Sequence, residues 1–391
     1  LPQDLVRFLM LAAVRFTYKV KPVHMERIPA TGGVLLLPNH VSYVDALIVG
    51  SASRRPVRFV MWDALYHLWW LKWLMRLIGT VPISATRAKD AIRAVAAALK
   101  EGEIVCLFPE GQITRHGMVN ELLKGFELMA RQGDAQVVPV YLDGLYGSIF
   151  SFQGGKFFTK RPKHLRYPVE VHFGEALGAR AATTEVMRHA MLALSSEAFL
   201  KRKSWSHAEA DTVAFANALR LAEIEWHHAG DVFLSLEPEG SIIHRTVKAL
   251  TQVMPGTKFI DHGPEAHPTH IVAFCTRSTL DKLTGQERLV FCLDSDLTHL
   301  PQTTALRGYI DADTGILLST EVPNPPMPAN DKDEQLGRKP NTLGRLLPGF
   351  AIESTTNGVR ISGLLPNDDR SISIPAVKMD EQGFLVSPNC S

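Results

Sequence analysis

The stretch "GGVLLLPNHVSYVDALIVG", residues 32–50, decides the fold of the first part of this chain. Its apolar run at 34–37 predicts a buried strand, and the segment from Tyr43 onward predicts a helix. His40 lies between the two elements, at the carboxyl end of the strand, where α/β proteins place their functional sites. Asp45 follows five positions later, and in an uninterrupted helix the two side chains would point roughly 140° apart. They can meet only if the chain bends between them.

Ser42 and Asp45 supply such a bend, because together they form an S-x-x-D capping pattern. A helix that starts near Ser42 leaves His40 outside it, so that the imidazole can fold back onto the Asp45 carboxylate. This pair would hold one tautomer of the ring, as a general base needs. The alternative is that Asp45 only caps the helix. The chain has no G-x-S-x-G serine context, so the base would act on a hydroxyl that the substrate brings.

Strand-like and helix-like runs alternate along residues 1–203. Strands separated by helices at this spacing predict an α/β sandwich with a mostly parallel sheet. The polar stretch "KRKSWSHAEAD" (201–211) predicts a linker. Residues 207–391 then predict a second α/β domain of shorter strands, including a hairpin whose turn lies at 356–358. We therefore expect two domains, at 1–203 and 207–391.

The composition is that of a globular chain, since 46% of its 391 residues are apolar and 21% are charged. A net charge of only +2 argues against a dedicated nucleic-acid binder. Basic residues nevertheless cluster at 54–58, 156–166 and 201–203. Such clusters suit phosphates or anionic lipid headgroups, or else form only a solvated surface. The four cysteines are scattered without a C-x-x-C pair, which predicts buried thiols at Cys106 and Cys292, a reducing compartment and no metal site.

Membrane contact is predicted at "MWDALYHLWWLKWLMRLIG" (61–79), which carries four of the six tryptophans beside Lys72 and Arg76. Tryptophan and basic residues on an apolar helix favour the membrane interface, and a buried amphipathic helix is the alternative. No apolar run reaches the roughly 18 to 20 residues that a membrane span needs. Because the chain starts at Leu1 rather than Met, we expect it to be a piece of a longer protein.

Three further stretches can complete a site around His40: "FPEGQITR" (108–115), "GTVPISATR" (79–87) and "VVPVYLDG" (137–144). Glu110 follows an apolar strand, where a carboxylate is costly to bury unless it binds something. Gly111 lets the backbone approach a ligand closely. Arg115 and Arg87 each offer a guanidinium to a phosphate. The stretch at 137–144 is apolar and is expected to form a wall of the site.

The ordered set N-H-x-x-x-x-D, G-x-x-P…R, F-P-E-G and V-P-V resembles the pattern of the PlsC-type glycerolipid acyltransferase family over residues about 20–200. "FPEGQITRHG" looks most like the acyltransferase half of the bifunctional 2-acylglycerophosphoethanolamine acyltransferase/acyl-ACP synthetase proteins. The resemblance implies that His40 deprotonates the free hydroxyl of a lysophospholipid while Asp45 orients the ring. It also implies that Glu110, Gly111, Arg115 and Arg87 hold the glycerophosphate. The stretch before Arg87 departs from the family, since Ser84 and Ala85 stand where a charged pair is common.

The second half resembles adenylate-forming acyl synthetases, in "GRKPNTLGRLLPGFAIE" (337–353), in "GILLSTEV" (315–322) and in "DEQGFLV" (380–386). The glycine-rich loop that cradles the triphosphate in that family is missing, and so are its T-G-D triad and its small C-terminal subdomain. We therefore interpret 207–391 as a reduced, degenerate AMP-binding domain that does not adenylate. It would position the acyl donor, or it would be a structural remnant.

These resemblances predict a membrane-surface acyltransferase that moves a fatty acyl group from acyl-ACP or acyl-CoA to a lysophospholipid, with lysophosphatidylethanolamine as the expected acceptor. No cofactor or metal is expected. Two alternatives stay open: a non-catalytic protein that binds acyl chains or acyl-ACP, and a bifunctional acyl-ACP synthetase plus acyltransferase. The expected location is the cytoplasmic face of the inner membrane, peripherally or through a fused membrane domain. A fused or partner lysophospholipid transporter is a further expected partner.

Overall fold

The structure, a computed structural model, describes residues 3–63, 79–84, 87–155, 157–158, 160, 166–202, 205, 211–228, 230–261, 270–296, 305–326 and 335–388. The chain divides into two compact units. The first unit consists of residues 1–114, 121–152 and 156–198, and the second of 115–120, 153–155 and 199–391. Most of the tryptophan-rich stretch predicted to contact a membrane (residues 64–78) and most of the predicted linker lie outside the described residues.

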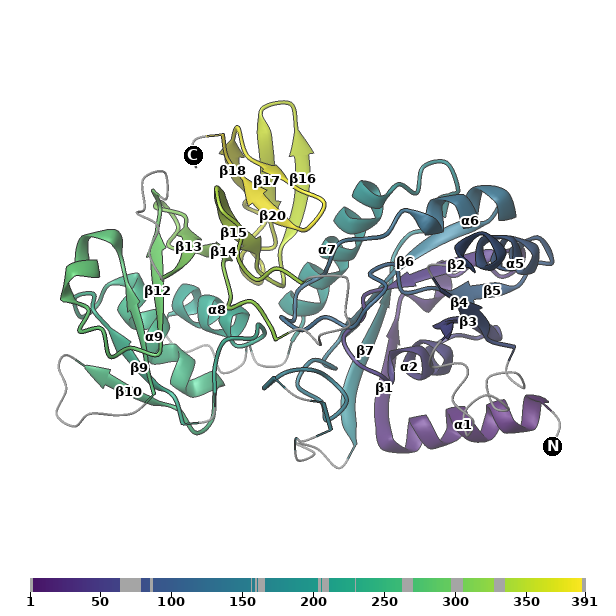
Figure 1. The fold of residues 1–391 in the computed structure, drawn as a ribbon, viewed down its shortest axis with the longest axis horizontal. Helices are drawn as coiled ribbons and strands as arrows, with labels where there is room; N and C mark the ends of the chain where they lie inside the picture. Colours follow the sequence, from purple (N-terminus) through teal and green to yellow (C-terminus); the bar gives the residue numbers. More distant parts are fainter. Residues whose placement is uncertain are drawn as a thin grey trace. The chain divides into compact units, whose positions relative to one another are not determined.

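The first unit is built on one sheet, which has eight strands within the described residues, in the order β1-β7-β6-β2-β5-β3-β4, with β8 paired to β6. All its pairings are parallel except those of β6 with β7 and with β8, so the predicted mostly parallel α/β sheet is confirmed (Figure 1). The strands are β1 (Tyr18–Val23), β2 (Val34–Pro38), β3 (Val57–Trp62), β4 (Val81–Ile83), β5 (Ile104–Cys106), β6 (Gln136–Asp143), β7 (Tyr167–Phe173) and β8 (Leu177–Gly178).

Strand β2 lies inside this sheet, between β6 and β5, and all five of its residues are buried. A strand covered on both faces reads as a continuous apolar run, as 34–37 does. Helices supply the cover, and α5 shows how: Ala91, Val95 and Leu99 recur on one face and are buried. The helices described in this unit are α1 (Gln3–Thr17), α2 (Asp45–Ala52), α5 (Ala88–Lys100), α6 (Gly125–Gly133) and α7 (Thr184–Leu200), with the short η1 (Met25–Arg27).

The predicted start of the helix after β2, near Ser42, is wrong. Helix α2 begins at Asp45, its N-cap is Val44, and no side chain caps it. The reason is that Ser42 is extended and forms an isolated antiparallel bridge with Ser151, while the Tyr43 N–H donates to the Phe150 carbonyl at 3.3 Å. Pairing with a distant segment therefore delays the helix by two residues, from Tyr43 to Asp45.

The strand before "FPEG" ends at Cys106, so Glu110 lies in the turn that follows it. Helix α6 begins only at Gly125. The Leu123 N–H donates to the Pro109 carbonyl at 2.8 Å, which holds the preceding residues in an irregular path against that turn.

The second unit has a sheet of nine strands within the described residues, ordered β10-β9-β11-β12-β13-β14-β15-β20-β19. The first five strands are parallel and the remaining pairs antiparallel, so this unit is also α/β, as predicted. The strands are β9 (Val232–Ser235), β10 (Lys258–Asp261), β11 (Ile271–Cys275), β12 (Leu289–Asp294), β13 (Leu306–Ile310), β14 (Leu317–Thr320), β15 (Thr342–Leu346), β19 (Lys378–Met379) and β20 (Phe384–Val386).

A small antiparallel sheet of β16 (Ala351–Thr355), β17 (Gly358–Ser362) and β18 (Ile372–Pro375) follows β15 in the chain. Its first two strands form the predicted hairpin, with Thr355 paired to Gly358 across the turn. The described helices of this unit are α8 (Thr212–Leu221) and α9 (Ile242–Val253), with η4 (Arg277–Lys282). The predicted burial of Cys106 and Cys292 is confirmed, and Cys275 is buried as well.

Among the helices that the structure describes, none combines the length and the apolar character that crossing a membrane requires.

Gly344 occupies a position in β15 that a larger residue would not fit. Its φ is +87°, in the left-handed region, and a Cβ there would lie 2.5 Å from the Thr320 carbonyl carbon. The pairing of β15 with β20 is also irregular between Thr342 and Arg345. Gly240 has a similar φ of +84°, but a Cβ there would meet nothing within 4 Å. An alanine at Gly240 would therefore carry the cost of the left-handed backbone without the steric clash.

We expect Gly344→Ala to lower the free energy of unfolding by about 3 kcal/mol, because it combines a left-handed backbone cost with a backbone clash. The matched Gly240→Ala should lose only about 1 kcal/mol. Chemical denaturation of both variants checks this. Equal losses would show that β15 moves freely away from β14 and that the clash is relieved.

His116, in the segment 115–120, is fully buried in the second unit. Its Nδ1 accepts a hydrogen bond from the Met118 N–H at 3.2 Å, which requires the neutral ring at that nitrogen. Burial holds the pKa of His116 well below its usual value, and the charge of Arg345 lowers this pKa further, while a hydrogen bond with Asn120 opposes the shift. The folded chain therefore resists taking up a proton here that the unfolded chain accepts.

Because the pKa of His116 is lower in the folded than in the unfolded state, its stabilising effect is complete above about pH 6.5 and falls as the pH drops below that value. We expect the free energy of unfolding to fall by up to about 1.4 kcal/mol per pH unit below this point. His116→Asn keeps an acceptor and removes the titration, so it should flatten the slope. An unchanged slope in that variant, measured by denaturation at several pH values, would rule this explanation out.

Candidate active site

The site is built where β2 ends, and Asn39 ties this end to the neighbouring strand β6. The Leu142 N–H donates to Asn39 Oδ1 at 2.7 Å, and Asn39 Nδ2 donates to the Leu142 carbonyl at 3.4 Å. Asn39 is buried, so both hydrogen bonds are shielded from water. These two hydrogen bonds therefore fix the backbone position from which His40 follows the end of β2.

The Asp45 carboxylate draws the chain back on itself directly after that point. Its Oδ2 accepts three hydrogen bonds: from His40 Nδ1 at 2.8 Å, from the Val41 N–H at 2.7 Å and from the Ser42 N–H at 2.9 Å. The predicted bend between His40 and Asp45 is thus present, although the helix begins later than predicted. Burial raises the pKa of the Asp45 carboxyl above its usual value, and the hydrogen bonds from His40 and from the two backbone N–H groups oppose that shift.

The His40 ring is held on one face and open at one edge. It stacks on Phe108, with ring centroids 4.1 Å apart and the planes inclined by 25°. Nδ1 is committed to Asp45, and 20% of the His40 side chain is exposed. Within the described part of the chain, no hydrogen bond engages Nε2 of His40. An Nδ1–H that donates to a carboxylate leaves Nε2 with its lone pair, which is the arrangement of a general base.

Glu110 and Thr114, both in the segment after β5, hold the backbone of the same residue. The His40 N–H donates to Glu110 Oε1 at 2.8 Å, and only 4% of Glu110 is exposed. The His40 carbonyl accepts from the Thr114 N–H at 2.8 Å. Gly111 has a φ of +71°, and a Cβ there would come within 2.8 Å of the Leu123 side chain. The segment that contains the "FPEG" turn therefore fixes the backbone of His40 through hydrogen bonds to its N–H and to its carbonyl.

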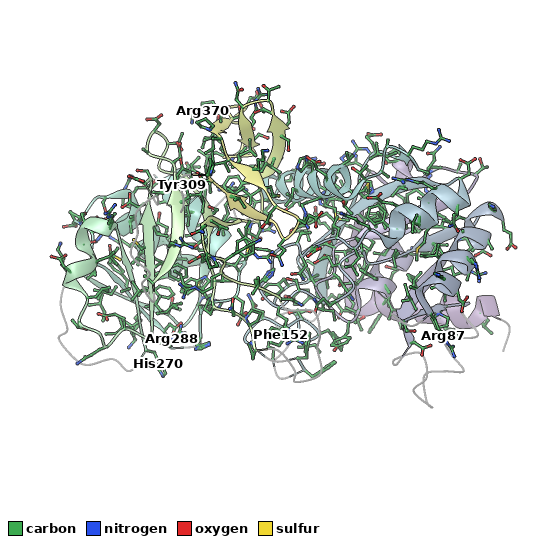
Figure 2. The ribbon with its side chains drawn as sticks, turned by 45° about the horizontal axis from the view of Figure 1, so that its top comes forward. Arg87, Phe152, His270, Arg288, Tyr309 and Arg370 are labelled. Atoms are coloured by element: carbon green, nitrogen blue, oxygen red, sulfur yellow. The ribbon has the colours of Figure 1, made fainter. Side chains whose placement is uncertain are left out.

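The two predicted arginines have other surroundings. Arg87 precedes α5, and its side chain is exposed (Figure 2). Arg115 is counted with the second unit, where its N–H donates to Gln335 Oε1 at 2.8 Å and its guanidinium to the Pro326 carbonyl. The structure thus gathers His40, Asp45, Glu110 and Gly111 around one turn, whereas the assignment of a phosphate to Arg87 or Arg115 stays a prediction.

Three residues of this site were given no role by the sequence: Asn39, Phe108 and Thr114. All three stand inside the quoted stretches, Asn39 beside His40, and Phe108 and Thr114 on either side of Glu110. Their signal was their position in the motif, because neither an asparagine at a strand end nor a phenylalanine before a turn points to chemistry by itself. Among the described residues, no group of three or more His, Cys, Asp or Glu side chains is arranged to hold a metal ion.

The contact of Glu110 with the His40 N–H leads to a prediction about stability. Glu110→Ala should lower the free energy of unfolding by about 2 to 3 kcal/mol, because it leaves a buried N–H without its charged acceptor. Glu110→Gln keeps a carbonyl oxygen and should lose only about half as much. Denaturation of the two variants measures the difference. If both lose the same, the carboxylate does not support His40 through this hydrogen bond.

Comparison with known proteins agrees with the geometry of the first unit. Residues 19–143 match the family described as Acyltransferase. The 1-acyl-sn-glycerol-3-phosphate acyltransferase of Bacillus subtilis is 27% identical over 139 residues, which are 35% of this chain and 69% of that protein. The chloroplastic 1-acyl-sn-glycerol-3-phosphate acyltransferase LPAT1 of Arabidopsis thaliana is 25% identical over 131 residues, or 32% of this chain and 36% of that protein. The chain therefore spans between about a third and two thirds of these curated relatives.

Two solved structures are also similar. The 1-acyl-sn-glycerophosphate acyltransferase PlsC from Thermotoga maritima covers 51% of this chain and 82% of its own, with 19% identity and a TM-score of 0.41. A mutant form of coronafacic acid ligase from Pectobacterium brasiliense covers 96% of this chain and 77% of its own, with 11% identity and a TM-score of 0.32. These two are likenesses of fold alone. The match over residues 19–143, which contain His40, Asp45 and the "FPEG" turn, shows that the first unit carries a domain of the Acyltransferase family.

Proposed function

We propose that the first unit transfers a fatty acyl group from a thioester to the free hydroxyl of a lysophospholipid, with His40 as general base and Asp45 as the residue that orients it. The observation that carries this proposal is the pair itself, in which Nδ1 of His40 lies 2.8 Å from Oδ2 of a fully buried Asp45. The Acyltransferase match over the same residues supports it.

The step that this geometry supports is a direct transfer. Nε2 of His40 takes the proton of the acceptor hydroxyl while the oxygen attacks the thioester carbonyl carbon. The new C–O bond forms, the C–S bond breaks, and the leaving thiolate receives the proton from the imidazolium. We propose no acyl-enzyme, because the base acts on the hydroxyl that the acceptor itself brings.

We also propose a specific acceptor lipid and a specific acyl donor, which rest on the sequence resemblance. The relatives are named for 1-acyl-sn-glycerol-3-phosphate. We propose lysophosphatidylethanolamine for this chain, on the resemblance of "FPEGQITRHG" to the bifunctional acyltransferase/synthetase proteins. On the same ground we propose acyl-ACP before acyl-CoA as donor. Both acceptors carry a free glycerol hydroxyl and a phosphate, so the chemistry at His40 is the same.

The phosphate contacts are also part of the proposal. Arg87 is exposed and able to reach a ligand from the start of α5. Glu110, by contrast, carries a negative charge and already accepts from the His40 N–H, which suits a supporting role better than phosphate contact. Gly111 gives the turn its shape. Arg115 would have to exchange its carbonyl partner for a phosphate.

We place this activity at a membrane surface, at the cytoplasmic face of the inner membrane, because the acceptor is a lipid. A fused or partner lysophospholipid transporter would deliver that acceptor. For the second unit we propose a role in positioning the acyl donor, without adenylation, because the sequence has no triphosphate-cradling loop.

Transfer assays with the whole chain test the proposal. With radiolabelled acyl-ACP or acyl-CoA and lysophosphatidylethanolamine, His40→Ala should lower kcat by about 10³-fold, since positioned base catalysis contributes about 10² to 10⁴. Asp45→Asn should lose about 10²-fold or more, because an amide no longer fixes the donating tautomer. The exposed His270 of the second unit gives the control, and His270→Ala should transfer as the wild type does.

Equal transfer by wild type and His40→Ala would show that the histidine is not the base. Replacing the acceptor by lysophosphatidic acid in parallel ranks the two headgroups. A strong ATP–pyrophosphate exchange signal would instead favour the bifunctional synthetase interpretation of the second unit.

A further inference from the structure

A group of aromatic rings, two of them exposed, begins at Tyr43, three residues after His40 in the first unit. We call it the aromatic platform, and it consists of Tyr43, Phe150, Phe157 and Phe158. Tyr43 stacks on Phe158 with centroids 5.5 Å apart and contacts Phe157 edge-on at 4.9 Å, and Phe150 meets Phe158 at 5.8 Å. Tyr43 is 48% exposed and Phe158 63%. Beneath them Phe152, labelled in Figure 2, is buried and packs on Phe157 at 5.2 Å.

Backbone hydrogen bonds fix the positions of the two exposed residues of the platform, Tyr43 and Phe158. The Tyr43 N–H donates to the Phe150 carbonyl, and the Phe158 N–H donates to the Ile149 carbonyl at 2.8 Å. Phe158 has a φ of +63°, in the left-handed region that a bulky residue rarely adopts. A large apolar ring is thus kept exposed in a strained conformation, and such strain persists where function selects for it.

Basic residues are concentrated in the sequence of the segment that carries three of the platform's rings. Between Asp143 and Glu170 the sequence contains no acidic residue. It contains six aromatic residues there, Tyr146, Phe150, Phe152, Phe157, Phe158 and Tyr167, and five basic ones, Lys156, Lys160, Arg161, Lys163 and Arg166. Lys160 Nζ donates to the Ser151 carbonyl, which places one of these cations at the edge of the platform. Aromatic rings interleaved with basic residues are typical of surfaces that bind anionic lipid headgroups.

We propose that the aromatic platform docks the first unit on a phospholipid bilayer that contains anionic lipids. The inference rests on the proposed function, because it brings His40, three residues before Tyr43, to the surface where a lysophospholipid resides. Phe158 and Tyr43 insert among the headgroups, and Lys160, at the edge of the platform, meets the lipid phosphates. A protein partner or a second copy of this chain would need acidic and apolar complements in one patch, and a bilayer supplies both.

A second exposed apolar surface, on α1, could also contact a membrane and has to be distinguished from the platform. Leu5, Leu9 and Phe16 of α1 recur on one helix face and are 41%, 53% and 79% exposed. The sequence of α1 carries no such concentration of positive charge around its apolar residues as the platform does. The experiment must therefore separate the platform from α1.

Vesicle co-sedimentation of the whole chain tests the docking without requiring turnover. Phosphatidylcholine vesicles with and without phosphatidylglycerol are the probes. Phe158→Asn removes the ring and suits the left-handed backbone, so it should keep the fold and weaken binding to the anionic vesicles about tenfold. Leu128→Asn, on α6 and 48% exposed, is the matched control and should bind as the wild type does. Binding should also fall when salt is raised.

If the wild-type chain does not bind the anionic vesicles, the proposal is wrong. It is also wrong if Phe158→Asn binds them as the wild type does while Phe16→Asn loses binding. A change from dimer to monomer in Phe158→Asn without vesicle binding by the wild type would make the platform a self-association surface and equally refute it. His40→Ala should sediment with the vesicles like the wild type. Docking without transfer by the wild type would therefore refute only the proposed function, and transfer without docking would refute only this inference.

Discussion

One oxygen atom of the first unit organises the rest of the site. Oδ2 of Asp45 is buried and accepts from the His40 ring, from the Val41 N–H and from the Ser42 N–H. Hydrogen bonds to an ionised acceptor are about twice as strong as neutral ones, and burial enhances them. The same atom thus holds both the ring and the backbone that carries it. The orientation of the imidazole and the bend before α2 therefore depend on one carboxylate oxygen.

Neighbouring parts of the sheet reinforce that bend from outside. Asn39 anchors it to β6, and Glu110 binds the His40 N–H from the turn after β5. Phe108 covers one face of the ring. Since β6, β2 and β5 are adjacent, their carboxyl ends deliver these groups to one place. A buried carboxylate on Glu110 would be costly alone, and here its charge is met by the donor that it positions.

What the sequence predicted well is local. The apolar run of β2 and the pairing of His40 with Asp45 involve neighbours within six residues, so the spacing of residue types suffices to predict them. The start of α2 was misplaced because it depends on Phe150 and Ser151, more than a hundred residues away. The contacts of Glu110 and Arg115 were likewise not predictable, since each depends on a partner at least 70 residues distant in the chain. Long-range pairing leaves no periodic signal in one sequence.

The distant pairing that misplaced the helix also connects the base to the surface beside it. Val41 and Ser42 give their N–H groups to Asp45, and the next residue, Tyr43, gives its N–H to Phe150 and stacks its ring on Phe158. A short extended segment is thus hydrogen-bonded to the Asp45 carboxylate at one end and to the segment of exposed aromatic rings at the other. Hydrogen bonds at both ends thus restrain the segment that joins the imidazole to the rings. If the rings seat on a bilayer as we propose, that contact also sets the depth at which His40 would meet its acceptor.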